Sequence, residues 1–128
     1  MPVKSLNSAV LKWPDPSAVL AALQSWTLIE NERHPELVRL GYFGSYARGD
    51  WGVGSDLDLL AIVRESSLPF ERRGCQWSVE KLPVPAEILV YTESEWETMR
   101  TSGSRFANVI QQETCWIFPS TTCGSAIP

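Results

Sequence analysis

The segment Tyr42–Val63 reads YFGSYARGDWGVGSDLDLLAIV and joins a glycine-rich loop to an apolar run that contains two aspartates, one residue apart. Burying a carboxylate is costly unless a cation or hydrogen-bond donors compensate. Residues two apart on a strand share a face, so Asp56 and Asp58 would point the same way and the leucines the opposite way. Two carboxylates on one face repel each other, so the pattern predicts a site for a positively charged group.

A hard divalent cation is the expected occupant of this carboxylate pair. Mg²⁺ takes oxygen ligands, commonly one or two carboxylates, with waters and phosphate oxygens completing its shell. Taken alone, an Asp-x-Asp at the start of a strand is more often a solvated edge than a metal site. Its combination with a glycine-rich loop between two strands favours a functional site.

The loop before the aspartates offers groups suited to phosphate. Gly44 permits a sharp exit from the preceding strand and a close approach of a ligand to the backbone. Ser45 is placed to begin a short helix whose free N–H groups would face a phosphate, and its hydroxyl adds a donor. Arg48 offers a positive charge one turn later, although a solvated surface position fits it equally well.

The composition agrees with one compact domain. The chain has 128 residues, of which 44% are hydrophobic and 20% charged, as in ordinary globular proteins. Its net charge of -4 argues against strong nonspecific binding of nucleic acid, which needs clustered Lys and Arg. A metal-dependent site lined by carboxylates suits this charge balance better.

The cysteines and the N-terminal segment predict a cytoplasmic protein. Cys75, Cys115 and Cys123 show no metal-like spacing, and we expect buried or incidental thiols in a reducing compartment. The first residues, MPVKSLNSAVLKWPDP, lack the apolar core of a signal peptide. No apolar run approaches the length of about 18–20 residues that a membrane span needs.

The predicted order of elements is helix, strand, loop, strand, strand, helix, strand. Asp15 as N-cap and Pro16 at the first helical position begin a helix that ends before Pro35. Ser104 is a candidate N-cap for a second helix within residues 93–113. Strands are expected at residues 37–43, 57–63, 86–92 and 115–118.

This order predicts an α/β (α+β) fold with a small mixed β-sheet and helices packed mainly on one face. We expect a single domain over residues 1–128, with a core at about 15–118 and a loose tail at 119–128. Of the other conspicuous residues, His34 is expected on the surface, and Arg72 and Arg73 are expected in a solvated turn, with contact to substrate as the alternative. Trp51, in the loop, could stack on a base or fold over the core. Four tryptophans are expected to pack in the core or against a partner: Trp26, Trp77, Trp96 and Trp116.

The stretch GSYARGDWGVGSDLDLL resembles the signature of the nucleotidyltransferase superfamily that includes DNA polymerase beta, especially its minimal bacterial branch. That signature is Gly-Ser, a small glycine-containing loop, and then Ser-Asp-x-Asp-Leu. The resemblance implies that the Gly-Ser turn holds the triphosphate of a nucleotide, ATP or another NTP. The nucleotide-binding residues expected on this basis are Gly44, Ser45, Arg48 and Ser55.

The resemblance also implies a catalytic metal site. Asp56 and Asp58 would bind two Mg²⁺ ions, or Mn²⁺, with a third carboxylate on a later strand helping to activate an acceptor hydroxyl. Glu87 in PAEILVYT is the candidate for this third position, where the family most often carries Asp. An exposed glutamate at a strand end is the alternative. Glu80, Glu93 and Glu95 are weaker candidates, and the last two fit the first turn of a helix.

Two functions follow from the resemblance. The first is transfer of a nucleoside monophosphate, AMP from ATP, to an acceptor hydroxyl by a two-metal mechanism. Minimal members often act as antitoxins that modify a separate helical partner of the HEPN type, so we expect such a protein partner and a homo- or hetero-oligomer. The second is a non-catalytic module that binds nucleotide or partner and retains the fold. We expect no membrane contact.

Overall fold

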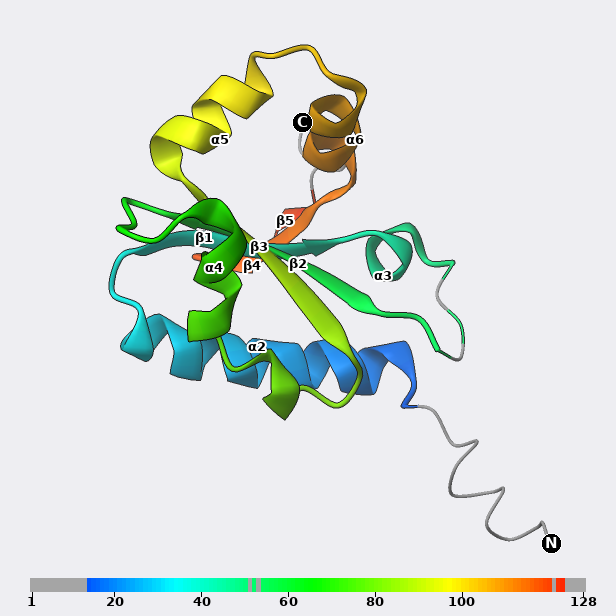
Figure 1. Cartoon of the computed structure of the whole chain (residues 1–128). Coiled ribbons are helices and arrows are strands. Elements are labelled where there is room, and N and C mark those ends of the chain that lie inside the picture. The colour runs from blue at the N-terminus through cyan, green and yellow to red at the C-terminus, as the bar shows by residue number, and fades with distance from the viewer. Residues whose placement is uncertain (1–13, 51, 53, 121, 124–128) are drawn as a thin grey trace, which may run out of the picture.

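The computed structural model describes residues 14–50, 52, 54–120, 122 and 123. Within this part the chain forms one five-stranded sheet in the order β3-β2-β1-β4-β5 (Figure 1). The first four strands have the predicted bounds, and the fifth is a short addition. The strands are β1 Leu37–Phe43, β2 Leu57–Val63, β3 Ala86–Thr92, β4 Cys115–Phe118 and β5 Thr122–Cys123.

The sheet is mixed, as the sequence predicts. Strand β1 lies antiparallel to β2 on one side and to β4 on the other, while β2 and β3 run parallel. Strand β2, LDLLAIV, is buried at six of its seven positions because both of its faces are covered. The exception is Asp58, which is only half-buried.

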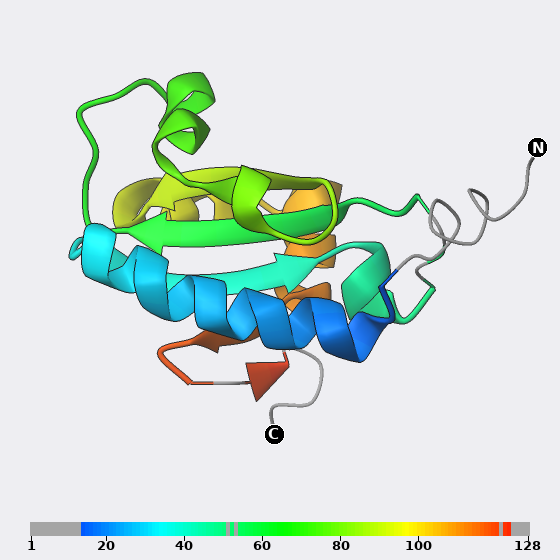
Figure 2. The ribbon, with the colours of Figure 1, turned by 90° about the horizontal axis from the view of Figure 1, so that it is seen from below.

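Helix α2, Pro16–Arg33, covers one face of the sheet and runs along the strands (Figure 2). It begins where the sequence predicts, because the Asp15 side chain accepts a hydrogen bond of 2.8 Å from the Ala18 amide and Pro16 has no N–H that would need an acceptor. It ends at the residue before His34, as Pro35 requires. Val19, Leu23 and other apolar residues of its inner side join the larger core cluster.

The other long helices lie on the opposite face (Figure 1). Helix α5, Glu93–Arg100, begins with a capping box between Thr92 and Glu95, and α6, Arg105–Glu113, is capped by the Ser104 hydroxyl. The remaining helices are short: α3 Ser45–Arg48, α4 Phe70–Arg73, η1 Gly74–Gln76 and η2 Val79–Lys81.

The α/β class is confirmed, but the helices are divided between both faces rather than gathered mainly on one. The reason lies in β2, whose side chains alternate between two apolar clusters. Leu57 and Leu59 join the cluster under α2, whereas Leu60 and Ile62 join the cluster under α5 and α6. A central strand that is apolar on both faces needs cover on both. The four tryptophans expected in the core or against a partner are all buried in the core: Trp26, Trp77, Trp96 and Trp116.

The prediction that His34 lies on the surface is wrong. Its ring is buried and stacks on Trp77, with 3.9 Å between ring centroids and 10° between planes. Its Nε2 atom lies 3.1 Å from the Gln76 carbonyl oxygen, and its Nδ1 atom 3.3 Å from a Glu36 carboxylate oxygen. These polar partners and the indole stack together make burial of the imidazole favourable.

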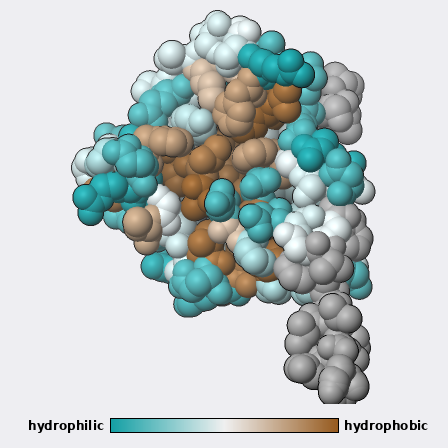
Figure 3. All heavy atoms as spheres, turned by 45° about the vertical axis from the view of Figure 1, so that its right-hand side comes forward, coloured by the Kyte–Doolittle hydropathy of each residue, from teal (hydrophilic) through white to brown (hydrophobic). Residues whose placement is uncertain are grey.

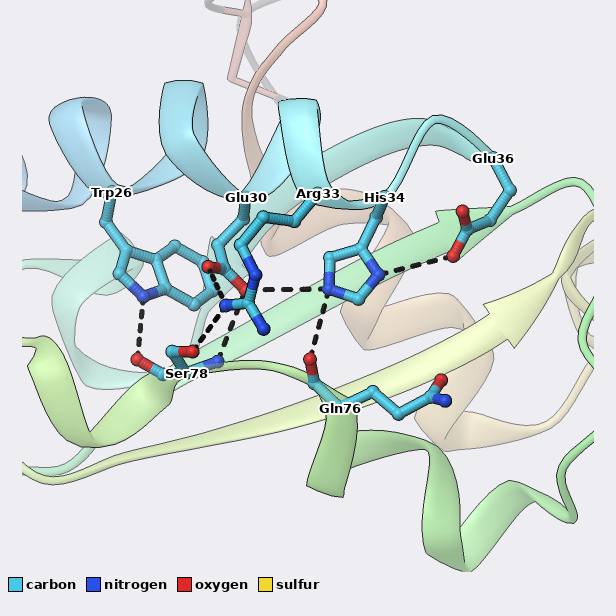
Figure 4. A network of polar contacts seen from close by, with 7 residues as sticks. All are labelled: Trp26, Glu30, Arg33, His34, Glu36, Gln76 and Ser78. Atoms are coloured by element: carbon cyan, nitrogen blue, oxygen red, sulfur yellow. Dashed lines mark hydrogen bonds and ion pairs between the residues drawn. The ribbon is translucent and has the colours of Figure 1, made fainter.

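His34 belongs to a polar network that joins the end of α2 to the loop before β3 (Figure 4). Its centre is Glu30, which is 1% exposed. The Glu30 carboxylate accepts hydrogen bonds from Arg33 Nη1 at 2.8 Å and from the Ser78 amide at 3.2 Å. The Trp26 indole donates to the Ser78 carbonyl oxygen at 2.8 Å. The buried Glu30 carboxylate therefore accepts hydrogen bonds from two separate segments, the end of α2 and the loop before β3.

The solvated position predicted for Arg73 is also wrong, while Arg72 is exposed as expected. Arg73 is buried because its guanidinium finds acceptors on every side. It donates to the Glu95 carboxylate at 2.6 and 3.1 Å, and to the carbonyl oxygens of Leu68 and Val90. Glu95 lies in the first turn of α5, as the sequence predicts, and pairs with Arg73 there.

Several predictions concern parts of the chain outside the described residues. Trp51 and most of the proposed tail lie there, and the division into one domain stays a prediction. Cys75 is exposed and Cys115 is buried. No helix of the described part of the chain has the length and apolar character to span a membrane.

Candidate functional site

The turn at Gly44 has a backbone that only glycine adopts readily. Gly44 has φ +78° and ψ −151°, and a Cβ atom built on it would collide with Oδ2 of Asp58. The Gly44 carbonyl oxygen then accepts hydrogen bonds from the amides of Ala47 and Arg48, each at 3.0 Å, which closes α3. Gly49, with φ +84°, ends the helix. The glycine therefore permits both the turn and the contact with Asp58.

Strand pairing brings the predicted carboxylates to the same end of the sheet. In the parallel pairing of β2 and β3, Asp58 is the direct partner of Glu87, and in the antiparallel pairing of β1 and β2 it is the partner of Phe43. Asp58 thus stands between the end of β1 and the start of β3. Asp56 precedes β2 and is exposed, as is Glu87.

The electrostatic surroundings of Asp58 are dominated by negative charge. Its partial burial raises the pKa of the carboxyl group, and the nearby charges of Glu87 and Asp56 raise the pKa further. Arg48 opposes this shift, while Glu113 adds a smaller contribution in the same direction as the other acids. The ionised form of Asp58 is therefore disfavoured until a cation or donor compensates it.

The sequence reasoning missed Glu113, which is part of this site. Its Oε2 atom accepts a hydrogen bond of 2.6 Å from the Gly44 amide, and its Oε1 atom accepts one of 3.2 Å from Arg48 Nη1. The Arg48 Nε atom donates to Asp50 at 3.1 Å. No local motif marks Glu113, because only the pairing of β1 with β4 brings residue 113 beside residue 44.

A family comparison decides what kind of domain carries this arrangement. Residues 29–114 match the model of the nucleotidyltransferase domain, a stretch that covers more than half of the chain and contains every site residue described above. The chain belongs to the nucleotidyltransferase domain family.

A solved structure supports the nucleotidyltransferase fold. The crystal structure of a proposed nucleotidyltransferase from Sulfolobus solfataricus superposes with a TM-score of 0.54 at 23% sequence identity. The superposition covers 64% of this chain and 74% of that one. At this identity the likeness concerns the fold. No curated protein matches the chain.

Within the nucleotidyltransferase domain, Ser55 has a clear structural role. Its hydroxyl accepts a hydrogen bond of 2.7 Å from the Gly52 amide, and its own amide donates to the Gly52 carbonyl oxygen at 2.9 Å. Ser55 therefore closes a turn directly before the two aspartates. Ser45, the other predicted hydroxyl, lies half-buried at the start of α3.

The donor set of the nucleotidyltransferase domain suits a hard divalent ion. In the described part of the chain, no three His, Cys, Asp or Glu side chains already lie close enough together to hold a metal ion. The register places Asp58 and Glu87 side by side, and Asp56 is near enough for its charge to raise the pKa of Asp58. Carboxylate oxygens are the ligands that Mg²⁺ prefers, so the chemistry of the residues fits.

The side of the molecule that carries α3 shows an apolar, hollowed surface bordered by hydrophilic side chains (Figure 3). The face of the sheet that carries Asp58 and Glu87 continues along the strands with Leu60 and Leu89. Leu60 is fully buried beneath α5 and α6, and Leu89 is half-buried. Helix α6 adds the exposed side chains of Phe106 and Val109. Asp58 and Glu87 therefore stand at the end of the sheet face that α5 and α6 cover.

Proposed function

We propose that this nucleotidyltransferase domain transfers a nucleoside monophosphate, AMP from ATP, to an acceptor hydroxyl. The observation that carries the proposal is the position of Asp58 between Gly44 and Glu87. This position sets carboxylates suited to cations beside a turn suited to phosphate. A nucleotide bound across both would have its triphosphate and its metal ions in one place.

The Gly44–Arg48 turn would hold the triphosphate. Gly44 lets the turn pack directly against Asp58, and the hydroxyl of the next residue, Ser45, would donate to a phosphate oxygen. Arg48 would contribute a positive charge. Ser55 would act from the other side of the loop, where it shapes the turn before Asp56.

Asp56, Asp58 and Glu87 would hold two Mg²⁺ ions, for which Mn²⁺ can substitute. The bound ions would neutralise the phosphates and stabilise the attacking and leaving oxygens of an in-line displacement. Without a cation the acids would repel a triphosphate, because three carboxylates face a single arginine already paired with Asp50 and Glu113.

In the transfer, a bond forms between the acceptor oxygen and the α-phosphorus, and the bond from that phosphorus to the bridging oxygen breaks. Pyrophosphate leaves with the electron pair of the broken bond. The acceptor proton passes to a carboxylate of the site, for which Glu87 is suited because it is exposed at the start of β3. The domain acts by positioning and charge compensation.

The acceptor would be presented by a separate protein, a helical partner of the HEPN type. Large apolar side chains on two helices support a protein contact of this kind. Leu28 and Ile29 on α2 are 67% and 57% exposed, and Phe106 and Val109 on α6 are 47% and 43% exposed. The two pairs lie on opposite faces of the sheet, so the partner would cover one of them, as contiguous exposed apolar side chains commonly meet another protein.

The proposal is tested by incubating the protein with Mg²⁺ and ATP labelled on the α-phosphate, with and without the product of the adjacent gene. Label is expected on the acceptor protein with α-labelled ATP and not with γ-labelled ATP, since the γ-phosphate leaves in pyrophosphate. The double variant Asp56→Asn, Asp58→Asn is expected to abolish transfer. Glu97→Gln, an exposed change on α5, serves as the matched control.

Absence of transfer with every labelled nucleotide, together with tight binding of the partner by the double variant, would contradict the proposal. That result would support the non-catalytic module. Transfer by the double variant at the wild-type rate would contradict the assignment of the two aspartates.

A further inference from the structure

We infer that Glu113 is a positioning residue that sets the Gly44–Arg48 turn for binding of the triphosphate. This inference rests on the proposed function and adds a residue to it. It begins from the two hydrogen bonds of one carboxylate. Glu113 accepts from the Gly44 amide at 2.6 Å and from the Arg48 guanidinium at 3.2 Å, so it holds both ends of α3.

The strand register explains why Glu113 reaches the turn. Strands β1 and β4 are antiparallel, with Gly41 opposite Trp116 and Tyr42 opposite Cys115. Gly44 directly follows β1 and Glu113 lies two residues before β4, so the antiparallel pairing of the two strands leaves these residues close together. The pairing is close, because a Cβ atom on Gly41 would lie 2.6 Å from the Cys115 carbonyl oxygen.

The position of Glu113 is fixed from both sides. Ile110, one turn earlier on α6, is 1% exposed, and the next residue, Thr114, is fully buried. The Thr114 amide and hydroxyl both donate to the Ile110 carbonyl oxygen. The Glu113 backbone therefore cannot shift without disturbing the core, and its carboxylate is held by the hydrogen bonds from Gly44 and Arg48.

Helix energetics alone would not place an acid here. Glu113 is the last residue of α6, where the partial negative charge of the helix end disfavours a carboxylate, and this last turn holds no basic residue. The compensation comes from outside the helix, from the Gly44 amide and Arg48. The Glu113 side chain is only 13% exposed, so these donors satisfy a carboxylate that water reaches poorly.

Gly44 is the residue that most needs such a support. Its φ of +78° and ψ of −151° are open to glycine, but the wide backbone freedom of glycine means that local preference alone does not hold it there. A charged acceptor on its amide fixes the direction of the peptide. The direction of this peptide sets where α3 begins, at Ser45, and how far Arg48 lies from Asp58.

The test compares Glu113→Ala and Glu113→Gln with Asp50→Asn as the matched control. Asp50 and Glu113 both pair with Arg48, and each change removes one negative charge, but only Glu113 contacts the Gly44 amide. The probe is inorganic tripolyphosphate with Mg²⁺, because it carries the part common to all nucleoside triphosphates. Its dissociation constant is measured by titration calorimetry.

Glu113→Ala is expected to raise the dissociation constant about ten- to hundredfold, as the loss of a charge-assisted hydrogen bond implies. Asp50→Asn is expected to change it less than about fivefold, as for an exposed ion pair. The dissociation constant of Glu113→Gln is expected to fall between those of the other two variants, because its amide oxygen still accepts a hydrogen bond from the Gly44 amide. Hydrogen exchange of the Gly44 amide, read by NMR, should speed up in Glu113→Ala while the Leu60 amide stays protected.

Equal or tighter binding by Glu113→Ala than by Asp50→Asn would overturn the inference, and binding tighter than that of the wild type would mean that Glu113 competes with the phosphates. If Glu113→Ala does not fold, binding by Glu113→Gln at least as tight as by Asp50→Asn would do the same. Failure of the wild-type protein to bind either tripolyphosphate or ATP with Mg²⁺ would instead overturn the proposed function, and the inference with it.

Discussion

Asp58 and Glu87 are direct partners in the parallel pairing of β2 with β3, so two carboxylates stand side by side where both strands begin. Like charges on neighbouring strands destabilise a sheet. Burial and these neighbouring acids together raise the pKa of Asp58, with Arg48 as the opposing charge. The fold therefore maintains a repulsion that a bound cation would relieve.

This repulsion predicts that Asp58→Asn stabilises the metal-free protein. We expect the free energy of unfolding to rise by about 0.2–1 kcal/mol, because the change removes a like-charged cross-strand pair. Urea denaturation in the presence of a chelator measures the difference. Glu97→Gln should change the free energy by less than about 0.5 kcal/mol. A metal-free Asp58→Asn protein less stable than the wild type would contradict the account.

The contact between Gly44 and Asp58 predicts a strong effect of Gly44→Ala. The new methyl group would meet Oδ2 of Asp58 in a backbone conformation that non-glycine residues rarely adopt. We expect a loss of about 1–3 kcal/mol in the free energy of unfolding, measured by urea denaturation. Gly49→Ala is the matched control, since Gly49 also has positive φ but no atom lies within 4 Å of its added Cβ. An equal cost for both changes would show that the contact with Asp58 is unimportant.

The buried network at the end of α2 predicts that Glu30→Ala is severely destabilising. The change removes the acceptor of the Ser78 amide and of Arg33, and takes away a carboxylate 3.6 Å from His34. We expect a loss of about 3 kcal/mol or more in the free energy of unfolding. Glu32→Ala, an exposed change on the same helix, should cost less than about 0.5 kcal/mol. Thermal unfolding of both variants decides whether the network holds α2 to the loop.

The pair of Arg73 and Glu95 predicts a pH dependence of stability. Hydrogen bonds from Arg73 lower the pKa of Glu95 from 4.5 to about 2. Because the unfolded chain takes up this proton first, the stabilisation is complete above about pH 4.5 and is lost as the pH falls towards 2. Glu95→Gln should therefore flatten the curve of unfolding free energy between pH 2 and 4.5. Glu97→Gln, which alters a more exposed pair, should leave this slope unchanged.

The main elements of the fold could be predicted from the sequence because their signals are local. Asp15 and Pro16 begin α2 through contacts within one turn, and Ser104 does the same for α6. The strand segments are short apolar runs between turns, and all four predicted bounds agree with the structure. The resemblance named Asp58 and Glu87, but their direct pairing in parallel strands comes from the structure.

The errors concern residues whose environment is created by distant parts of the chain. His34 and Arg73 are polar residues near turns. Their neighbours in the sequence do not show that His34 will stack on Trp77 or that Arg73 will pair with Glu95. Glu113 is hidden for the same reason, because its role depends on the register of β1 with β4. Tertiary pairing of this kind leaves no local pattern.

The most direct test of the central claim is the Mg²⁺ dependence of ATP binding, measured by titration calorimetry with the wild type and with Asp58→Asn. The account predicts that the wild type binds ATP with Mg²⁺, that a chelator removes the binding, and that Asp58→Asn binds at least about tenfold more weakly. ATP binding of equal strength in the presence of the chelator, or unchanged binding by Asp58→Asn, would contradict the claim that the Gly44 turn and the carboxylates form one site.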